Sequence, residues 1–245
     1  MSWKSGIEWT SATWNPVTGC SKISAGCLNC YAERMARRLQ AMGNQRYEHG
    51  FEVTLHSDIL TLPLRWKRSK LIFVNSMSDL FHEEVPDRFI EEVFHTIARA
   101  DWHIFQVLTK RTERLRALAP RLEWPENLWM GVTVENQACA GRIDDLLSTE
   151  AETKFISAEP LLGPLDTPLD GLDWVIVGGE SGPNARTMQP DWVRALRDQC
   201  ITSGVAFFFK QWGGVQKKRN GRILDGRTWD ELPYSNRASQ LKLIA

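Results

Sequence analysis

The sequence lacks the features that would place the protein in several specialised classes. No apolar run approaches the roughly 20 residues that a membrane-spanning helix needs, so no membrane association is expected. The stretch from Met1 to Trp14 has no apolar core of the kind found in secretory signals, which predicts a cytoplasmic protein. No internal repeat or low-complexity tract is evident.

The sequence also lacks an excess of charge of one sign, because 30 basic and 30 acidic residues give a formal net charge of zero. Bulk charge therefore does not indicate a strongly basic nucleic-acid-binding protein. The basic residues are unevenly distributed, which fits either solvated surfaces or a phosphate-binding rim. Three segments are rich in them: RWKRSK (65–70), KRTERLR (110–116) and KKRNGR (217–222).

Cysteine is scarce, with five residues in 245, and three of the five fall within eleven positions. A small secreted scaffold held by disulfides would be denser in cysteine, so a metal or redox role is favoured. Cys200 lies on the apolar stripe of a predicted helix and is expected in the core. The length and the 42% of hydrophobic residues fit one large domain with a substantial core.

Short apolar runs rich in β-branched and aromatic residues are expected to form strands that are buried on both faces. A weaker candidate strand, residues 7–14, precedes the cysteines. Helical periodicity is expected in segments between and beside these runs. The strand candidates are 71–79, 103–111, 128–136, 154–160, 174–182 and 205–214, and the helix candidates are 31–42, 86–100, 112–118, 136–147 and 191–203.

The alternation of strand and helix predicts an α/β fold with a parallel sheet, either a partial or full (βα) barrel or, as the alternative, a flat doubly wound sheet. Residues 1–214 are expected to form the barrel domain, and 215–245 an appendage or tail. Functional residues gather at the carboxyl ends of the strands in both architectures. The polar residues that follow the apolar runs therefore predict a polar pocket at one end of the sheet.

Cys20, Cys27 and Cys30 are separated by six and two residues, and Gly19 and Gly26 allow the loop to fold back so that the thiols converge. Thiolates at this density bind zinc or an iron–sulfur cluster. A structural zinc site needs four ligands, and no fourth cysteine or histidine follows at finger-like spacing. The pattern favours a cluster with one open iron over a zinc site with a distant ligand or three unligated thiols.

Several motifs resemble the radical S-adenosylmethionine superfamily, and more closely a three-cysteine family of phages and bacteria first described from mycobacteriophages. A more distant similarity is to spore photoproduct lyase. The usual radical S-adenosylmethionine gap between the first two cysteines is three residues, whereas here it is six. The motifs that carry the resemblance are TGC (18–20), SxGCxNCYA (24–32), NSMSDLF (75–81), LTKR (108–111), EPLLGP (159–164), VGGESG (177–182) and FKQWG (209–213).

The resemblance implies that the three cysteines hold a [4Fe–4S] cluster whose fourth iron binds S-adenosylmethionine. Reductive cleavage then gives a 5′-deoxyadenosyl radical that abstracts hydrogen from the substrate, with electrons from a donor such as flavodoxin or ferredoxin. A nucleic acid is favoured as the substrate, for lesion repair or base modification. Two alternatives are a non-catalytic zinc or iron–sulfur module that binds nucleic acid, and a barrel hydrolase that uses strand-end carboxylates.

Other residues are assigned roles within this hypothesis. The strand end at residues 75–79 is expected to contact the methionine amino group, or else to cap the next helix. Tyr31 is expected to pack on the cluster or the adenine, or in the helix core. The cofactor-binding candidates are thus Tyr31, Asn75, Ser76, Ser78, Asp79, Glu135, Gly179, Glu180 and Ser181.

The catalytic candidates are Cys139, Lys110 and Glu159. Cys139, near a helix start past a strand end, is a candidate hydrogen-atom donor. Glu159, like Glu135, is a candidate for binding ribose hydroxyls or substrate. Lys110, with Arg111 and Lys210, is expected to offset carboxylate or phosphate charge, or else to form salt bridges with strand-end glutamates.

Overall fold

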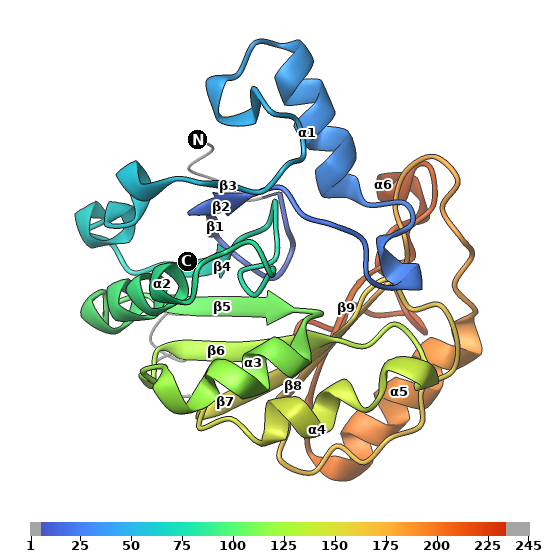
Figure 1. Cartoon of the computed structure of the whole chain (residues 1–245). Helices are drawn as coiled ribbons and strands as arrows, with labels where there is room; N and C mark the ends of the chain where they lie inside the picture. Colours follow the sequence, from blue (N-terminus) through green and yellow to red (C-terminus); the bar gives the residue numbers. More distant parts are fainter. Residues whose placement is uncertain (1–5, 234–245) are drawn as a thin grey trace.

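The computed structural model describes residues 6–233, and its centre is a sheet of seven parallel strands that curls into a half barrel (Figure 1). Each strand pairs with the next strand of this sheet along the chain, so β1 and β9 form the two edges. The partial barrel is therefore confirmed, and the flat doubly wound alternative is not observed. The strands are β1 (Ala12–Trp14), β4 (Leu71–Val74), β5 (Ile104–Thr109), β6 (Leu128–Thr133), β7 (Thr153–Ala158), β8 (Trp174–Gly178) and β9 (Ala206–Gln211).

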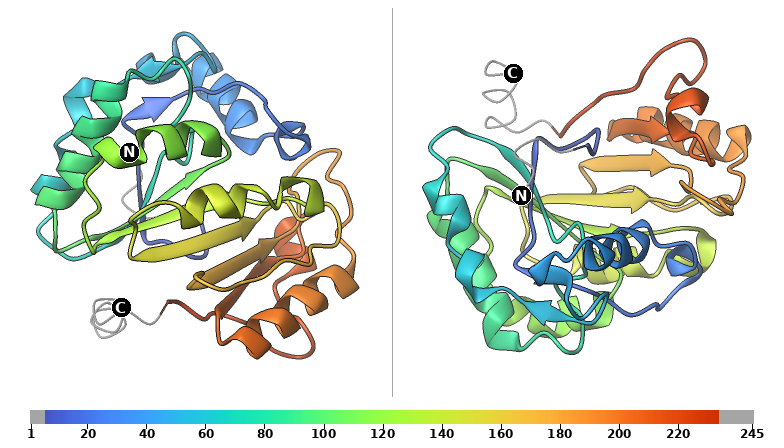
Figure 2. Two further views of the ribbon diagram at one scale, coloured as in Figure 1. Left: turned by 60° about the horizontal axis from the view of Figure 1, so that its bottom comes forward. Right: turned by 90° about the horizontal axis from the view of Figure 1, so that it is seen from above.

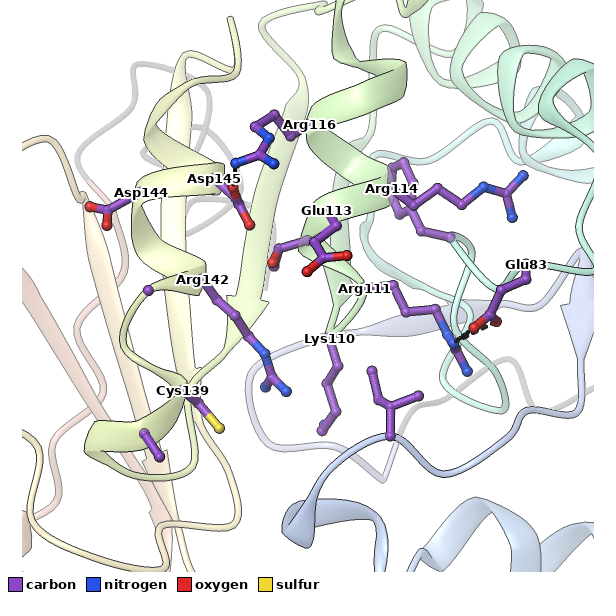
Figure 3. Close-up of a pocket in the computed structure, with 15 residues that line it drawn as sticks. Glu83, Lys110, Arg111, Glu113, Arg114, Arg116, Cys139, Arg142, Asp144 and Asp145 are labelled. Atoms are coloured by element: carbon purple, nitrogen blue, oxygen red, sulfur yellow. Dashed lines mark hydrogen bonds and ion pairs between the residues drawn. The ribbon is translucent and has the colours of Figure 1, made fainter.

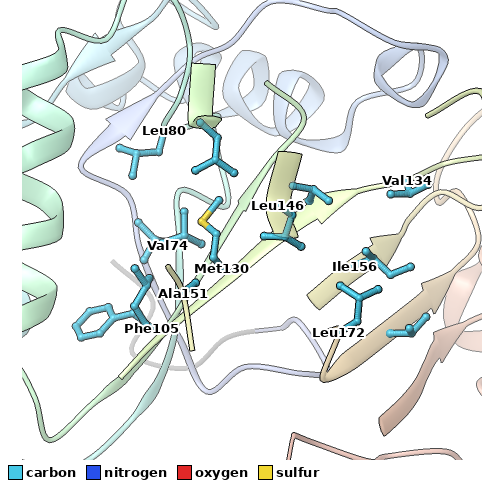
Figure 4. Packing of buried hydrophobic residues seen from close by; sticks show 14 of the residues in the cluster. Val74, Leu80, Phe105, Met130, Val134, Leu146, Ala151, Ile156 and Leu172 are labelled. Carbon is cyan, nitrogen blue, oxygen red and sulfur yellow. The ribbon is translucent and has the colours of Figure 1, made fainter. Parts of the chain in front are cut away.

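Helices lie along the outside of the half barrel (Figures 1 and 2). The apolar side chains of the four helices within residues 87–203 form one buried cluster with the outward-facing residues of the strands, such as Val74, Phe105, Met130 and Ile156 (Figure 4). This cluster is the main core. The helices are α1 (Tyr31–Ala41), α2 (Asp87–Arg99), α3 (Thr112–Leu118), α4 (Arg142–Leu147), α5 (Pro190–Ser203) and α6 (Lys217–Asn220).

A second buried cluster, rich in aromatic rings, lies on the opposite face of the sheet. The ring of Trp174 is at its centre, with centroids 5.5 Å from Phe155 and 5.9 Å from both Trp129 and Phe208. Both faces of the central strands are thus covered by apolar side chains. This explains why the strands appear in the sequence as continuous apolar runs.

The predicted elements are found with a few corrections. The predicted helix at 136–147 is divided into a 3₁₀ turn (Gln137–Cys139) and α4. In α1, the apolar stripe of Tyr31 and Met35 is not the buried face, because these side chains are 51% and 43% exposed. Ala32 and Ala36 are buried instead, since small side chains let the helix approach its neighbours closely.

A small antiparallel pair, β2 (Val17–Thr18) and β3 (Thr54–Leu55), was not expected from the sequence. The two strands flank the segment that carries the cysteines and α1. Their pairing brings residues 19 and 52 together, and so closes this segment at its base. Short 3₁₀ turns, also not predicted, occupy parts of the same region and of the connections: 25–27, 45–47, 57–59, 62–65 and 119–121.

The chain beyond residue 214 packs on the edge strand β9. Leu224 and Trp229 belong to the main core. The backbone N–H of Phe209 donates to the Trp229 carbonyl at 2.9 Å, and that of Glu231 donates to Phe207 at 3.3 Å. Residues 234–245 of the predicted appendage lie outside the described part. Within residues 6–233, no helix is long and apolar enough to span a membrane.

Candidate functional site

The cysteine loop, residues 20–30, lies past the carboxyl ends of the strands, between β2 and α1 (Figure 1). Cys20, Cys27 and Cys30 are free and partly exposed. Gly19, at the entrance, has a φ of +83°, and a Cβ on it would lie 2.0 Å from the carbonyl oxygen of Glu52. Only glycine therefore fits the turn that starts the loop.

The start of the loop is held by Arg111, which follows β5 and is 7% exposed. Its Nη2 donates to the Oγ and the carbonyl oxygen of Ser21 at 2.9 and 3.1 Å, and its Nη1 lies 2.5 Å from Glu83. The Nδ1 of His82 accepts from the backbone N–H of Glu84 at 3.2 Å, so its Nε2 can donate to Ser21 Oγ at 2.8 Å. Burial and the Arg111 charge lower the pKa of His82, which favours this neutral form.

The middle of the loop is held by Glu135, which follows β6 and is 1% exposed. Its carboxylate accepts from Ser24 Oγ at 2.5 Å and from Arg142 Nη1 at 2.8 Å, and the Lys110 ammonium lies 4.0 Å away. Burial alone would raise the pKa of Glu135, but Lys110, Ser24 and Arg142 together lower it. A Cβ on Gly26 would lie 2.3 Å from the same carboxylate, so the loop backbone rests directly on it.

The end of the loop is held by Glu180, which follows β8 and is 6% exposed. It accepts from Asn29 Nδ2 at 3.0 Å and from Arg186 Nε and Nη2 at 2.9 and 2.6 Å. Arg186 Nη2 also donates to the carbonyl oxygen of Ala25 at 2.9 Å. Burial alone would raise the pKa of Glu180, but the bonds from Arg186 and Asn29 lower it to about 2.

The thiols differ in their electrostatic surroundings. Burial and the nearby Asp79 carboxylate raise the pKa of Cys20 to about 11, although Arg111 opposes this. Burial would also raise the pKa of Cys27, but hydrogen bonds with the backbone at Ile23 and Ser24 and the charge of Lys110 lower it. Cys27 therefore loses its proton more readily than Cys20, and the thiolate is the form that binds metals.

The donor set fits a cluster with three thiolate ligands in number and type. The three thiols lie on one loop of eleven residues and none forms a disulfide. Within the described residues, however, no group of three His, Cys, Asp or Glu side chains is arranged to hold a metal ion. Ligation would therefore require the cysteine side chains to converge from the positions observed.

A pocket of about 740 Å³ opens between α3, α4 and the cysteine loop (Figure 3). Lys110 and Arg142 point into the same space at the end of the pocket nearest the loop, beside Cys139 (Figure 3). Burial and a hydrogen bond with Glu135 raise the pKa of the Cys139 thiol, which keeps it protonated at neutral pH. The pocket therefore joins cationic groups and a neutral thiol beside the cysteine loop.

The strand end at 75–79 is engaged mainly with protein atoms. Ser76 Oγ donates to Asn15 Oδ1 at 3.1 Å, and Ser78 Oγ donates to the Val17 carbonyl at 2.8 Å. Asp79 accepts from the Thr109 hydroxyl at 2.7 Å and from the backbone N–H groups of Lys110 and Phe81 at 3.0 Å.

Asn75 differs from these neighbours. It is 3% exposed and has a φ of +58°, and its Oδ1 accepts from the backbone N–H of Val17 at 3.2 Å. Its Nδ2 has no hydrogen-bond partner among the described residues. A buried amide donor without a partner is costly. Asn75 is therefore the member of this strand end with a donor available to a ligand.

The remaining candidates lie further along the same edge. Glu159 forms an ion pair of 3.0 Å with Lys210, as the salt-bridge alternative predicted. A Cβ on Gly179 would lie 2.1 Å from the Trp212 carbonyl oxygen, so its close approach is to protein backbone. Ser181 Oγ accepts from Gln211 at 2.7 Å. Tyr31 donates its hydroxyl to the carbonyl oxygen of Ser76, while its ring is half exposed.

Several residues that hold the loop were not among the sequence-based candidates: Ser21, Ser24, Asn29, His82, Arg142 and Arg186. Ser24 and Asn29 are among the fixed non-cysteine positions of the SxGCxNCYA motif, so a signal for them was present. The sequence around Arg142 and Arg186 gives no indication that these arginines bind a carboxylate. Their carboxylate partners are seven and six positions away, across the turns that follow β6 and β8.

Comparisons with known proteins give one family match and two similar solved structures. A family model described as "Protein of unknown function (DUF5131)" matches residues 4–233. No curated protein matches the chain. A structure of spore photoproduct lyase complexed with dinucleoside spore photoproduct is similar, with 12% identity, a TM-score of 0.43, and coverage of 92% of this chain and 69% of that chain. A mutant of that enzyme gives 11% identity, a TM-score of 0.45 and the same coverage.

Proposed function

We propose that this chain, which belongs to the DUF5131 family, is a radical S-adenosylmethionine enzyme that acts on a nucleic acid. The observation that carries the proposal is the cysteine loop, where three free thiols are held at the carboxyl ends of a parallel half barrel. Side chains from the ends of β5, β6 and β8 fix this loop at its start, middle and end. Kinship with the three-cysteine family first described from mycobacteriophages is part of the same proposal.

In this proposal Cys20, Cys27 and Cys30 hold a [4Fe–4S] cluster. When bound, the cluster supplies the electron that cleaves S-adenosylmethionine and so generates a 5′-deoxyadenosyl radical. The chain's own residues hold the cysteine loop and orient the methionine moiety. Arg111, Glu135 and Glu180 fix the loop, while the unpartnered Nδ2 of Asn75 is available as a donor to the methionine moiety.

The pocket beside the loop is the proposed substrate site. Lys110 and Arg142 share the single carboxylate of Glu135, so this end of the pocket has one cation in excess over that carboxylate. Such an arrangement suits an anionic substrate, which supports nucleic acid. The protonated thiol of Cys139 is the proposed hydrogen-atom donor, because it lines the same pocket. Glu159 and Lys210 form a neutral pair that is proposed to face the substrate.

The electron donor is proposed to approach from the exposed side of the cysteine loop. Ile23 and Leu28 lie between the cysteines and are 42% and 60% exposed. Two exposed apolar side chains on one loop offer a small contact surface to another protein. A small redox protein such as a flavodoxin or ferredoxin fits, since contacts between electron-transfer partners are small and transient.

The decisive experiment is anaerobic reconstitution with iron and sulfide. The wild type should hold about four irons per chain and, with dithionite and S-adenosylmethionine, should release 5′-deoxyadenosine. Cys27→Ala should lose both properties. Cys200→Ala is the matched control, because Cys200 is fully buried in the main core and away from the loop. Stoichiometric zinc without iron in the wild type would sink the proposal in favour of a metal-binding module.

The hydrolase alternative has less support. A hydrolase needs a carboxylate that can reach water, and Glu135 is 1% exposed and held between Ser24 and Arg142. Glu159 is bound to Lys210. A hydrolytic activity that survives Cys27→Ala would nonetheless reverse this preference.

A further inference from the structure

The segment from Arg65 to Lys70, RWKRSK, lies at the opposite end of the sheet from the cysteine loop. It directly precedes β4, so it sits at the amino ends of the strands (Figure 1). Arg65, Lys67 and Arg68 are exposed. None of these three side chains forms an ion pair or hydrogen bond with another residue in the range 6–233.

This lack of partners contrasts with several other exposed cations of the described surface. Several exposed arginines elsewhere have carboxylate partners: Arg88 lies 3.3 Å from Glu92, and Arg194 lies 2.9 Å from Asp225. The 65–70 segment holds four basic residues and no acidic one. A local excess of positive charge that has no partner among residues 6–233 is available to an anionic molecule.

The cationic segment is held rigidly against the turn that precedes β5. Trp102 Nε1 donates to the Trp66 carbonyl at 2.7 Å, and Ser69 Oγ donates to the Trp102 carbonyl at 2.6 Å. The Lys70 ammonium lies 5.7 Å from the centre of the Trp66 ring. Trp102 itself is 39% exposed. The surface thus combines a fixed backbone, several cations and an exposed indole.

We propose that residues 65–70 and Trp102 form a second nucleic-acid contact surface, here called the amino-end surface, which binds the sugar-phosphate backbone of a long substrate. Arg65, Lys67 and Arg68 contact phosphates, and Trp102 offers a flat face to a base or sugar. The surface is polar and cationic, as nucleic-acid interfaces are, and Trp102 is its exposed large apolar side chain. This inference rests on the proposed function in taking nucleic acid as the substrate.

The geometry also gives the length of nucleic acid required. β5 connects the Trp102 turn to Lys110 and Arg111 at the cysteine loop, and it has six residues. At about 3.3 Å per residue the two ends lie roughly 20 Å apart. A duplex rises about 3.4 Å per base pair, so the length of β5 alone corresponds to about six base pairs. The amino-end surface therefore contacts the nucleic acid at a distance from the nucleotide that reacts.

The test is binding of a duplex of about 20 base pairs to the full chain between about 50 and 200 mM salt, without S-adenosylmethionine. The triple variant R65Q/K67Q/R68Q should reduce the slope of log affinity against log salt by about 2.7, since each phosphate contact contributes about 0.9. The matched control R88Q/R121Q/R194Q removes the same charge from arginines that have carboxylate partners. It should leave the slope close to that of the wild type.

Two further ligands test whether binding depends on the phosphate backbone of the nucleic acid. A peptide nucleic acid duplex has an uncharged backbone and should not distinguish the wild type from the triple variant. Poly-glutamate should compete poorly with the duplex. An unchanged slope in the triple variant, an equal change in the control, or equal competition by poly-glutamate would overturn the inference. Because the readout is binding alone, each of these results is separate from 5′-deoxyadenosine release, which tests the proposed function.

Discussion

The two ends of the half barrel carry similar cations in different surroundings. At the carboxyl ends, Arg142 and Arg186 are paired with Glu135 and Glu180, whose carboxylates are almost fully buried. At the amino ends, Arg65 and Lys67 are exposed and have no such partner in the described part of the chain. Buried pairs fix geometry and are costly to break, whereas exposed single charges contribute little to folding. The carboxyl end is thus built to hold a loop in place, and the amino end to meet an external anion.

Glu135→Ala tests the buried ion pairs at the carboxyl ends and is expected to have the largest effect. It removes the carboxylate that Ser24 and Arg142 bind, and leaves the partly buried Arg142 and Lys110 cations without a counter-charge. We expect a loss of about 3 kcal/mol in the free energy of unfolding, measured in urea. The Cys27 thiol should also react faster with a thiol reagent, because the loop is no longer held. A loss below about 1 kcal/mol would mean that the pair contributes no more than an exposed one.

Glu180→Gln should have the next largest effect and depend on pH. The folded pKa of Glu180 is about 2, below the ordinary value of 4.5, so its stabilising contribution is complete above pH 4.5 and is lost as pH falls toward 2. We expect the variant to be less stable than the wild type by about 2 kcal/mol at pH 7. Urea unfolding from pH 7 to pH 3 should show this difference shrinking below about pH 5. A difference that stays constant with pH would contradict the charge-based account.

Gly26→Ala tests whether the loop must touch the Glu135 carboxylate. The added methyl group would lie 2.3 Å from Oε1, so the carboxylate or the loop must move. We expect a loss of about 1–2 kcal/mol in stability. Gly141→Ala is the matched control, because its φ is −58° and nothing lies within 4 Å of the added Cβ. This control should be neutral or slightly stabilising by thermal unfolding.

R65Q/K67Q/R68Q should have the smallest effect on folding, although it removes three charges. Because these side chains have no partner in residues 6–233, we expect the free energy of unfolding to change by less than about 0.5 kcal/mol. Urea unfolding under the conditions used for Glu135→Ala gives the direct comparison. A loss comparable with that of Glu135→Ala would show that the amino end also relies on its charges for folding.

Much of the fold could be predicted from the sequence. The runs around Phe105, Met130 and Val175 are apolar at nearly every position because both faces of their strands are buried. The face of α1 was misjudged, since Tyr31 and Met35 are larger and more apolar than the alanines that are actually buried. Periodicity identifies the helix, but the choice between two adjacent stripes depends on how closely the neighbouring chain approaches.

The candidate site could be predicted as a location but not as a set of contacts. The rule that strand ends gather functional groups correctly places Arg111, Glu135 and Glu180 at one edge. Which loop atoms they bind depends on contacts across 90 to 151 positions in the chain, and no spacing reveals these. The motifs are informative when they are taken together, because Ser24 and Asn29 of the SxGCxNCYA motif bind carboxylates that follow later strands.

An incomplete barrel has a further consequence, because it leaves two strand edges, β1 and β9, that another polypeptide could extend. On β9 this edge is covered from within the chain, since Trp229 accepts from Phe209 and Glu231 donates to Phe207. The Glu231 side chain also accepts from the Phe207 backbone N–H at 2.9 Å. The stretch around Trp229 therefore guards against edge-to-edge stacking of neighbouring molecules and against the insoluble fibres that such stacking can seed.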